Sequence, residues 1–407
     1  MSLLLTTFHY ALWAVGIFLL LNCLYLLFFS AMGHRQLPAL RPMATPRLRR
    51  MCVLIPAYRE DVVILDTARQ ALAHAYSGPA RVVVVADGLQ PTTLSTLRQL
   101  GAEVVEVTFE RSTKGKALLH ALTVLPDNTY DVAVVLDADN IMGLGCLTNI
   151  NAAFDAGYRV VQTHRTAKNQ GTAFAFLDAC NEEINNHIYR QGPAAIGLSS
   201  ALIGSGMAFD YGYLRQLLAG IGETVGEDKE LDFRIARDGY KIAYLARTYT
   251  YDEKIENAQV FTQQRTRWLA SQVEFLKKYA GEGVRELVQN GNVEFFHKAL
   301  QTFLVPRTLL MGVLGLFFLA SLVLPVGPAV GFWAGLLGLL AIALFGALPG
   351  RLYNKQLVQA LARLPYAIWC MCLALLRIRR TKSSFLATPH RVQAPVNQLE
   401  NQTPHAV

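Results

Sequence analysis

Short β-branched runs alternate with stretches of helical length between about residues 50 and 162. The runs that predict strands are Met51–Ile55, Arg81–Ala86, Val104–Val107, Val132–Leu136 and Arg159–Gln162. The stretches that predict helices are Val62–Tyr76, Pro91–Leu100, Lys116–Leu125 and Leu144–Ala156. Strands and helices that alternate in this way form a parallel sheet with helices on both faces. Because the run Val82–Val85 is continuous valine, it fits a strand buried on both sides. We therefore predict an α/β domain.

Beyond Gly171 this alternation weakens. The next predicted elements are a long helix at Ala173–Arg190, a small-residue stretch at Ser199–Phe209 and a helix at Glu227–Arg237 that stops before Gly239. From about residue 258 to 300, apolar and charged residues alternate at helical spacing. This pattern fits helices that lie flat on a membrane surface. It also fits ordinary amphipathic helices on the soluble domain.

Two long segments carry no charged residue or histidine. Tyr10–Gly33 is an uncharged run of 24 residues, which is enough to span a bilayer. Thr308–Gly350 has 43, and the turn residues Pro325–Pro328 split it into two predicted spans. A third uncharged run, Leu364–Leu376, has only 13 residues and basic residues on both sides, so it predicts an interfacial or re-entrant helix.

The composition agrees with membrane segments. Hydrophobic residues make up 52% of the chain and charged residues 17%, and the mean hydropathy is +0.27, which argues against a purely soluble protein. The first uncharged run lacks a basic segment before it, so we interpret it as an uncleaved anchor and not as a signal peptide. Five arginines follow it: Arg35, Arg41, Arg47, Arg49 and Arg50. They place residues from about 35 to 300 in the cytoplasm and the N-terminus outside.

The net charge of +8 is explained by basic residues beside the membrane segments. No nucleic-acid recognition module is visible in the sequence, so we predict no nucleic-acid partner. The six cysteines show no C-x-x-C spacing, which argues against both a disulfide framework and a zinc site.

Polar residues follow three of the predicted strands. They are Tyr58 and Glu60, Asp87, and the pair Asp137 and Asp139. Ligands of such sheets bind beyond the carboxyl ends of the strands, so we expect a site at this edge. Mg²⁺ or Mn²⁺ typically bridges one or two carboxylates to substrate phosphates, which makes Asp137 and Asp139 candidate metal ligands. The other interpretation of this pair is a solvated turn.

Two further motifs carry candidate chemistry. Glu227 and Asp228 open a predicted helix, where carboxylates also favour the helix dipole; Asp228 is the candidate general base. In Gln264-Arg-Thr-Arg267-Trp268, a guanidinium suited to phosphate oxygens stands beside an indole suited to stacking on a sugar ring. An interfacial helix with an anchoring tryptophan would explain the same residues.

Together these motifs resemble the membrane-embedded family 2 glycosyltransferases, which include the cellulose, chitin, hyaluronan and poly-N-acetylglucosamine synthases. The resemblance covers residues from about 50 to 390. The motifs that carry it are Pro56-Ala-Tyr58-Arg-Glu60, Asp87-Gly88, Lys114-Gly-Lys116-Ala, Asp137-Ala-Asp139, Gly204-Ser-Gly206, Glu227-Asp228 and Gln264-x-x-Arg267-Trp268. It implies a GT-A (Rossmann-like) fold, a UDP-sugar donor, Mg²⁺ or Mn²⁺, and inversion at the anomeric carbon.

The resemblance also implies roles for single residues. The implied donor-binding residues are Tyr58, Glu60, Asp87, Lys116, Asp137, Asp139, Gln264 and Arg267, with Asp137 and Asp139 also holding the metal. The implied catalytic residues are Asp228 and Glu227, and the implied acceptor-binding residues are Trp268, Gly204, Ser205 and Gly206. Two departures stand out: Ala86 replaces a common aspartate, which bears on base recognition, and His120 replaces a common asparagine.

These patterns divide the chain into six predicted segments. They are a transmembrane anchor (1–34), a cytoplasmic GT-A glycosyltransferase domain (50–255), the Q-x-x-R-W and interfacial helices (256–302), two transmembrane helices (303–350), an interfacial or re-entrant helix (351–380) and a cytoplasmic tail (381–407). We expect an integral membrane protein. The resemblance to the family implies that it lies in a bacterial inner membrane.

The leading hypothesis is a synthase that extends a β-linked polysaccharide and passes it across the membrane. Three spans are few for a channel, so an oligomer, an export partner or the re-entrant helix would complete one. A second hypothesis is transfer of one sugar to a membrane lipid, as ceramide glucosyltransferases do. A third is a nucleotide-sugar sensor that has no catalytic activity.

Overall fold

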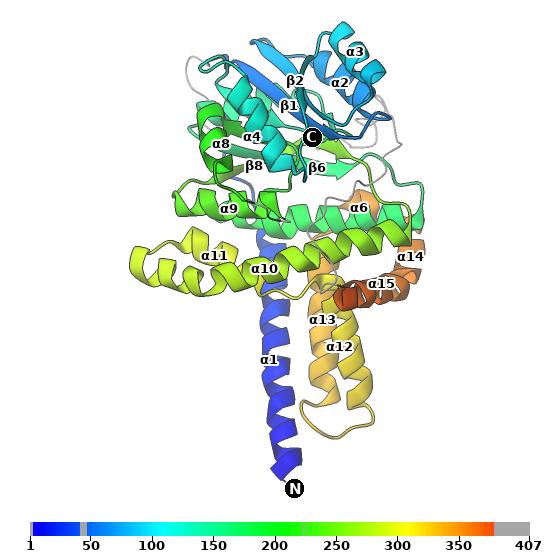
Figure 1. Cartoon of the computed structure of the whole chain (residues 1–407). Helices are drawn as coiled ribbons and strands as arrows, with labels where there is room; N and C mark the ends of the chain where they lie inside the picture. The colour runs from blue at the N-terminus through cyan, green and yellow to red at the C-terminus, as the bar shows by residue number, and fades with distance from the viewer. Residues whose placement is uncertain (1–2, 41–46, 223, 225, 378–407) are drawn as a thin grey trace.

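The computed structural model describes residues 3–40, 47–222, 224 and 226–377. An α/β domain stands above a layer of helices that lie crosswise, and three helices project below that layer (Figure 1). The predicted tail at 381–407 lies outside the described residues.

Within the described residues, eight strands form one sheet in the order β3-β2-β1-β4-β7-β6-β8-β5. The strands are β1 (Met51–Tyr58), β2 (Ala80–Asp87), β3 (Glu103–Val107), β4 (Val132–Val135), β5 (Ile141–Met142), β6 (Val160–Ala167), β7 (Met207–Asp210) and β8 (Ile242–Asp252). Strands β1 to β4 are parallel, and β6 is parallel to β8. The predicted all-parallel sheet is wrong in one respect: β7 is antiparallel to both neighbours, and β5 is antiparallel to β8.

Helices cover both faces of the sheet, as predicted. One apolar cluster joins the sheet to α2 (Ile64–Leu72), α3 (Pro91–Gln99) and α5 (Cys146–Asp155). A second cluster joins the other face to α4 (Lys114–Val124), α8 (Tyr211–Leu218) and α9 (Glu227–Arg237). Alternate residues of β1 divide between the two clusters, because successive side chains of a strand point to opposite faces.

The crosswise layer lies directly beneath the domain (Figure 1). Its elements are α6 (Ala173–Asn185), the π-helix η1 (Asn186–Gln191), α7 (Gly192–Ala195), α10 (Ala258–Asn290), α11 (Val293–Thr302), the 3₁₀ turn η2 (Gly350–Leu352), α14 (Lys355–Ala362) and α15 (Leu364–Arg377). One apolar cluster packs α10 and α15 together with α12 (Arg307–Ser321). The predicted helix at 173–190 is present as α6 followed by η1, so its last turn has π geometry.

The projecting helices are α1 (Leu3–Met32), α12 (Arg307–Ser321) and α13 (Val330–Gly346). They share an apolar cluster, and the hydroxyl of Ser30 donates to the Ala343 carbonyl. Among the described residues, α1 alone is long and apolar enough to cross a membrane by itself. The pairs α11–α12 and α14–α15 reach that length only if each bent pair, at 54° and 46°, counts as one span, and α13 is a shorter apolar helix. The two later spans and the interfacial helix remain predictions.

Candidate active site

A cavity of about 870 Å³ opens at the carboxyl ends of β1, β2 and β4. From there it continues past the start of α9 to α6, α10 and the elbow between α11 and α12. Segments far apart in the sequence therefore meet around one space. This is the edge of the sheet where the strand-end polar residues predict a site.

The upper end of the cavity is built by β1 and β2. Because these strands are parallel neighbours, their register pairs Tyr58 with Asp87, and Glu60 follows in the next loop. All three residues line the cavity. Asp87 is buried, and the Ser112 hydroxyl donates to its carboxylate. Tyr58, Glu60 and Asp87, three of the residues predicted to bind the donor, thus lie together at this end of the cavity.

Asp137 and Asp139 line the middle of the cavity, directly after β4. The Ser205 hydroxyl accepts a hydrogen bond from the Asp137 backbone N–H (2.9 Å), and the Lys114 ammonium contacts the Asp137 carboxylate. Asp139 is buried, and its carboxylate accepts a hydrogen bond from the Glu253 backbone N–H (3.3 Å). The turn is therefore held by interactions within the protein and is not a free solvated turn.

A divalent ion is compatible with this pair of carboxylates. No group of three or more His, Cys, Asp or Glu side chains with metal-binding geometry occurs among the described residues. Mg²⁺ is usually bound by one or two carboxylates together with substrate phosphates and water. Asp137 and Asp139 supply that part of the ligand set, so the residues fit an ion that arrives with a phosphorylated donor.

Glu227 and Asp228 form the first turn of α9 and face the same cavity. Glu227 accepts a hydrogen bond from the Gly115 backbone N–H (2.7 Å), and its other carboxylate oxygen is buried without a hydrogen-bond partner. Burial raises the pKa of Glu227, and the Gly115 N–H opposes this shift. Burial also raises the pKa of Asp228, and the charge of Asp232 raises it further. Both carboxyls thus have a raised proton affinity, as a general base near neutral pH needs.

Gln264, Arg267 and Trp268 project from α10 into the cavity. Residues three and four apart share one face of a helix, which explains why the three side chains line the same cavity. Burial lowers the pKa of Arg267, and the nearby charges of Asp228 and Glu227 offset part of that shift. Trp268 is 41% exposed and lines the cavity, and the Arg265 guanidinium lies over its ring, 3.9 Å from the centroid.

The Gly204-Ser-Gly206 motif divides between two roles. Gly204 lines the cavity and has a φ of +87°. Ser205 is fully buried, does not line the cavity and holds the Asp137 backbone. Gly206 is also buried and has a φ of +62°, and a Cβ there would lie 2.2 Å from the Thr163 hydroxyl. The structure places Gly204 at the cavity but Ser205 and Gly206 outside its lining, which differs from the acceptor-binding role expected for these two residues.

Lys116 also differs from expectation. It does not line the cavity, and its ammonium donates to the Arg111 carbonyl (3.4 Å). Lys114 occupies the cavity instead. Thr113 caps α4 by accepting from the Lys116 N–H, which makes Lys114 the first helical residue and turns it toward the sheet edge. The N-cap threonine is the sequence signal that distinguishes the two lysines.

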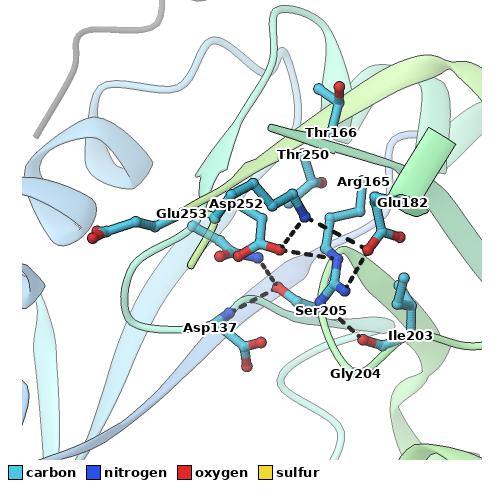
Figure 2. Close-up of polar contacts among 12 residues, drawn as sticks. Asp137, Arg165, Thr166, Glu182, Ile203, Gly204, Ser205, Thr250, Asp252 and Glu253 are labelled. Carbon is cyan, nitrogen blue, oxygen red and sulfur yellow. Dashed lines mark hydrogen bonds and ion pairs between the residues drawn. The ribbon is translucent and has the colours of Figure 1, made fainter. Parts of the chain in front are cut away.

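A buried ionic network near Asp137 has no sequence signal, because its members come from β6, α6, β8 and the residues just after β8 (Figure 2). The Arg165 guanidinium donates to Glu182 (2.9 Å) and to the Ile203 carbonyl (3.3 Å), and pairs with Asp252 (3.3 Å). Lys254 pairs with Asp252 (2.8 Å). Arg165, Glu182, Asp252 and Lys254 all line the cavity, so they form a rigid charged wall near the turn at Asp137.

Comparisons with known proteins agree with this geometry. Residues 46–271, more than half of the chain, match the model of the family described as Glycosyltransferase like family 2. The probable glycosyltransferase YdaM of Bacillus subtilis (strain 168) is 25% identical over 314 residues, which cover 73% of this chain and 72% of that protein.

Solved structures share the fold. The mannosyltransferase PcManGT from Pyrobaculum calidifontis, in complex with GDP-Man and Mn²⁺, superposes with a TM-score of 0.58 at 17% identity and covers 92% of this chain and 99% of that chain. Glucosyl-3-phosphoglycerate synthase from Mycobacterium tuberculosis, in complex with Mn²⁺, UDP and its product, gives a TM-score of only 0.34 over 51% of this chain and 72% of that one. The first match agrees with a GT-A-like mixed α/β fold.

Proposed function

Because this chain belongs to the family 2 glycosyltransferases, we propose that it moves a sugar from a UDP-sugar to an acceptor at a membrane surface, with inversion at the anomeric carbon. The observation that supports the proposal most is that residues of the separate motifs line one cavity. Asp137 and Asp139, Asp228, and Arg267 with Trp268 come from three distant segments and line one cavity.

The donor occupies the upper and middle parts of the cavity. Tyr58, Glu60 and Asp87 hold the nucleotide base and ribose, and Asp137 and Asp139 hold the metal ion. A bound Mg²⁺ or Mn²⁺ neutralises the negative charge that builds on the departing diphosphate. Arg267 and Gln264 contact the same diphosphate, because a planar guanidinium matches phosphate oxygens.

Asp228 takes the proton from the acceptor hydroxyl as that oxygen attacks the anomeric carbon. The new bond joins the acceptor oxygen to this carbon, and the bond from the carbon to the diphosphate oxygen breaks, releasing UDP. Glu227 supports this step from beside Asp228 and fixes the start of α4 through Gly115. General-base assistance of this kind contributes about 10²- to 10⁴-fold in rate.

For the acceptor, we propose a growing β-linked polysaccharide. The exposed ring of Trp268 at the cavity supports this, because an indole stacks well on a sugar ring. The lower end of the cavity supports a lipid acceptor as the alternative. It is lined by Leu304, Val305 and Pro306 at the elbow where the apolar α12 begins.

The protein is proposed to be anchored in a bacterial inner membrane with its α/β domain in the cytoplasm. The apolar helix α1 supports the anchoring. If the product crosses the membrane, a homo-oligomer or an export partner would complete the passage. Nucleic acid has no place in this proposal.

The test uses membranes that hold the protein, Mn²⁺ or Mg²⁺, and each labelled UDP-sugar in turn, with GDP-mannose included as a donor of a different base. The product is then sized. We expect a high-molecular-weight product from one UDP-sugar. Label confined to a small species that organic solvent extracts would replace the polysaccharide with the lipid acceptor, and activity with GDP-mannose alone would overturn the UDP assignment.

A further inference from the structure

Lys114 reaches the centre of the cavity from the first residue of α4. Its ammonium contacts the Asp137 carboxylate and donates to the Gly204 carbonyl (2.5 Å). The Lys114 side chain is 21% exposed and that of Asp137 is 33% exposed, so both remain open to the cavity. One ammonium therefore connects the turn after β4 to the loop before β7.

The backbone at Lys114 is held on both sides. The Gly115 N–H donates to Glu227 (2.7 Å), and the Thr113 hydroxyl accepts from the Lys116 N–H (3.2 Å). A Cβ at residue 115 would lie 3.1 Å from the Glu227 carboxylate, so this contact is close. The ammonium of Lys114 can thus change partners by rotating its side chain, while the start of α4 stays in place.

A divalent ion on Asp137 conflicts with this ammonium. Like charges at such short range repel strongly inside a protein cavity, where screening is weaker than in water. A nucleotide diphosphate brings the opposite charge to the same place, and the N-terminus of α4 also favours an anion there. When the donor and its metal ion bind, the Lys114 ammonium would therefore lose its contact with the Asp137 carboxylate and gain one with the diphosphate.

We propose that Lys114 and the divalent ion exchange on Asp137, with Lys114 moving onto the donor diphosphate as the ion takes the carboxylate. This inference rests on the proposed metal site at Asp137 and Asp139. Lys114 is then both a ligand of the donor and a competitor of the metal. The two ligands become coupled: the diphosphate holds Lys114 away from Asp137, and each ligand strengthens the binding of the other by the same factor.

The test measures Mn²⁺ binding to the purified full-length protein in detergent, by the electron paramagnetic resonance signal of free Mn²⁺, with and without UDP. For K114M without UDP, we expect Mn²⁺ affinity to rise roughly tenfold above the wild type, because the competitor is gone. At saturating Mn²⁺, we expect UDP affinity to fall by roughly the same factor, because a phosphate ligand is lost. Effects of opposite sign on the two ligands are the signature of exchange.

K277M is the control. It removes the same charge from an exposed residue of α10 that does not line the cavity, and both affinities should match the wild type. K114Q, which keeps a polar side chain, should behave as K114M does. A thermal unfolding transition, measured for both variants, will check that each is folded, so the test does not depend on the methionine variant alone.

Unchanged or weaker Mn²⁺ binding by both Lys114 variants without UDP would overturn the exchange. D139N separates this failure from failure of the proposed function. If D139N loses Mn²⁺ while the Lys114 variants do not gain it, only the exchange is wrong. If D139N binds Mn²⁺ as the wild type does, the metal site itself is wrong.

Discussion

Asp228 is the residue on which the proposed chemistry depends most, because its carboxylate is the proposed general base. Burial raises its pKa, and the charge of Asp232, one helical turn further along α9, raises it again. The Lys229 N–H and the charges of Lys114 and Lys229 act in the opposite direction. Burial is thus the main cause of the raised pKa of Asp228, and Asp232 is the neighbouring charge that adds to it.

The first prediction concerns pH. A base acts as the carboxylate, so kcat/KM should rise with pH through a pKa above the ordinary value of an aspartate. Asp232→Asn removes a neighbouring negative charge, which makes the Asp228 carboxylate easier to form. We expect the acid limb of the pH–rate profile to move to lower pH in this variant.

Asp127→Asn is the control, because Asp127 is an exposed surface residue, 71% exposed at its side chain, and should leave the limb where it is. An acid limb that stays fixed or moves to higher pH in Asp232→Asn would contradict the assignment of Asp228 as the base.

Single residues also show where sequence patterns stop being informative. The motifs place Asp137 and Asp228 at one cavity correctly, because the first follows strand β4 and the second lies in the first turn of α9. Arg267 lies inside α10, and only the resemblance to the family motif indicates its place at the cavity. The motifs do not show that Ser205 and Gly206 lie outside the cavity lining, since a short Gly-Ser-Gly run has the same sequence whether it contacts a ligand or supports a neighbouring segment. In Gly206 the reason is steric: its left-handed backbone and the adjacent Thr163 leave no room for a side chain.

Among the elements, β6, α6 and β8 with the residues just after it carry the buried charged wall of Arg165, Glu182, Asp252 and Lys254. Burial alone would raise the pKa of Glu182, but Arg165, Lys254 and Arg190 outweigh it and hold the pKa well below its usual range. The carboxylate therefore stays charged in a dry setting. Its stability contribution is present above the ordinary pKa of a glutamate and is lost only as the pH falls toward the lowered value.

The second prediction tests this wall. Arg165→Met leaves Glu182 and Asp252 short of a partner, and breaking a buried ion pair in this way costs about 3–5 kcal/mol of unfolding free energy. Arg98→Met is the matched control, since the Arg98–Glu106 pair is about half exposed on both sides and such pairs contribute about 0–1 kcal/mol. The midpoint of unfolding in detergent, measured for both variants, checks the difference. Equal midpoints would mean that the wall is not a stabilising element.

The elements were predictable where one local pattern dominates. The first four predicted strands and the helices between them are confirmed, because buried β-branched runs and turn residues mark them clearly. The sequence pattern does not predict β8, although the strand is rich in tyrosine and threonine, because its partner strand β6 is far away in the sequence. The antiparallel β7 was missed for a similar reason: only its neighbours β4 and β6 define its direction.

At the scale of the whole molecule, the cavity joins the sheet edge to the crosswise helices, and the apolar helices continue below them (Figure 1). Helices α1, α12 and α13 expose large apolar side chains, including Ile17, Leu316 and Ile342. This arrangement agrees with a membrane on the lower side, where an acceptor would enter. The orientation follows only from the arginines after α1 and is a prediction.

The third prediction concerns this orientation. Gln99→Cys lies on α3 in the α/β domain, and Ala329→Cys lies in the turn between α12 and α13; both positions are exposed. In sealed right-side-out vesicles, an impermeant maleimide should label Ala329→Cys at once and Gln99→Cys only after detergent is added. The unsubstituted protein gives the background from the native cysteines. Labelling of both positions from the same side would contradict three spans with a cytoplasmic domain.

The measurement that tests the central claim most directly compares wild type with Asp228→Asn in one preparation, for both turnover of the preferred UDP-sugar and Mn²⁺-dependent UDP binding. We expect kcat to fall by about 10²- to 10⁴-fold while UDP affinity stays near that of the wild type, because only the base is lost. Turnover by Asp228→Asn within a few-fold of the wild type would contradict the role of Asp228. A wild type that binds UDP without any turnover would contradict the proposed transferase and leave the nucleotide-sugar sensor.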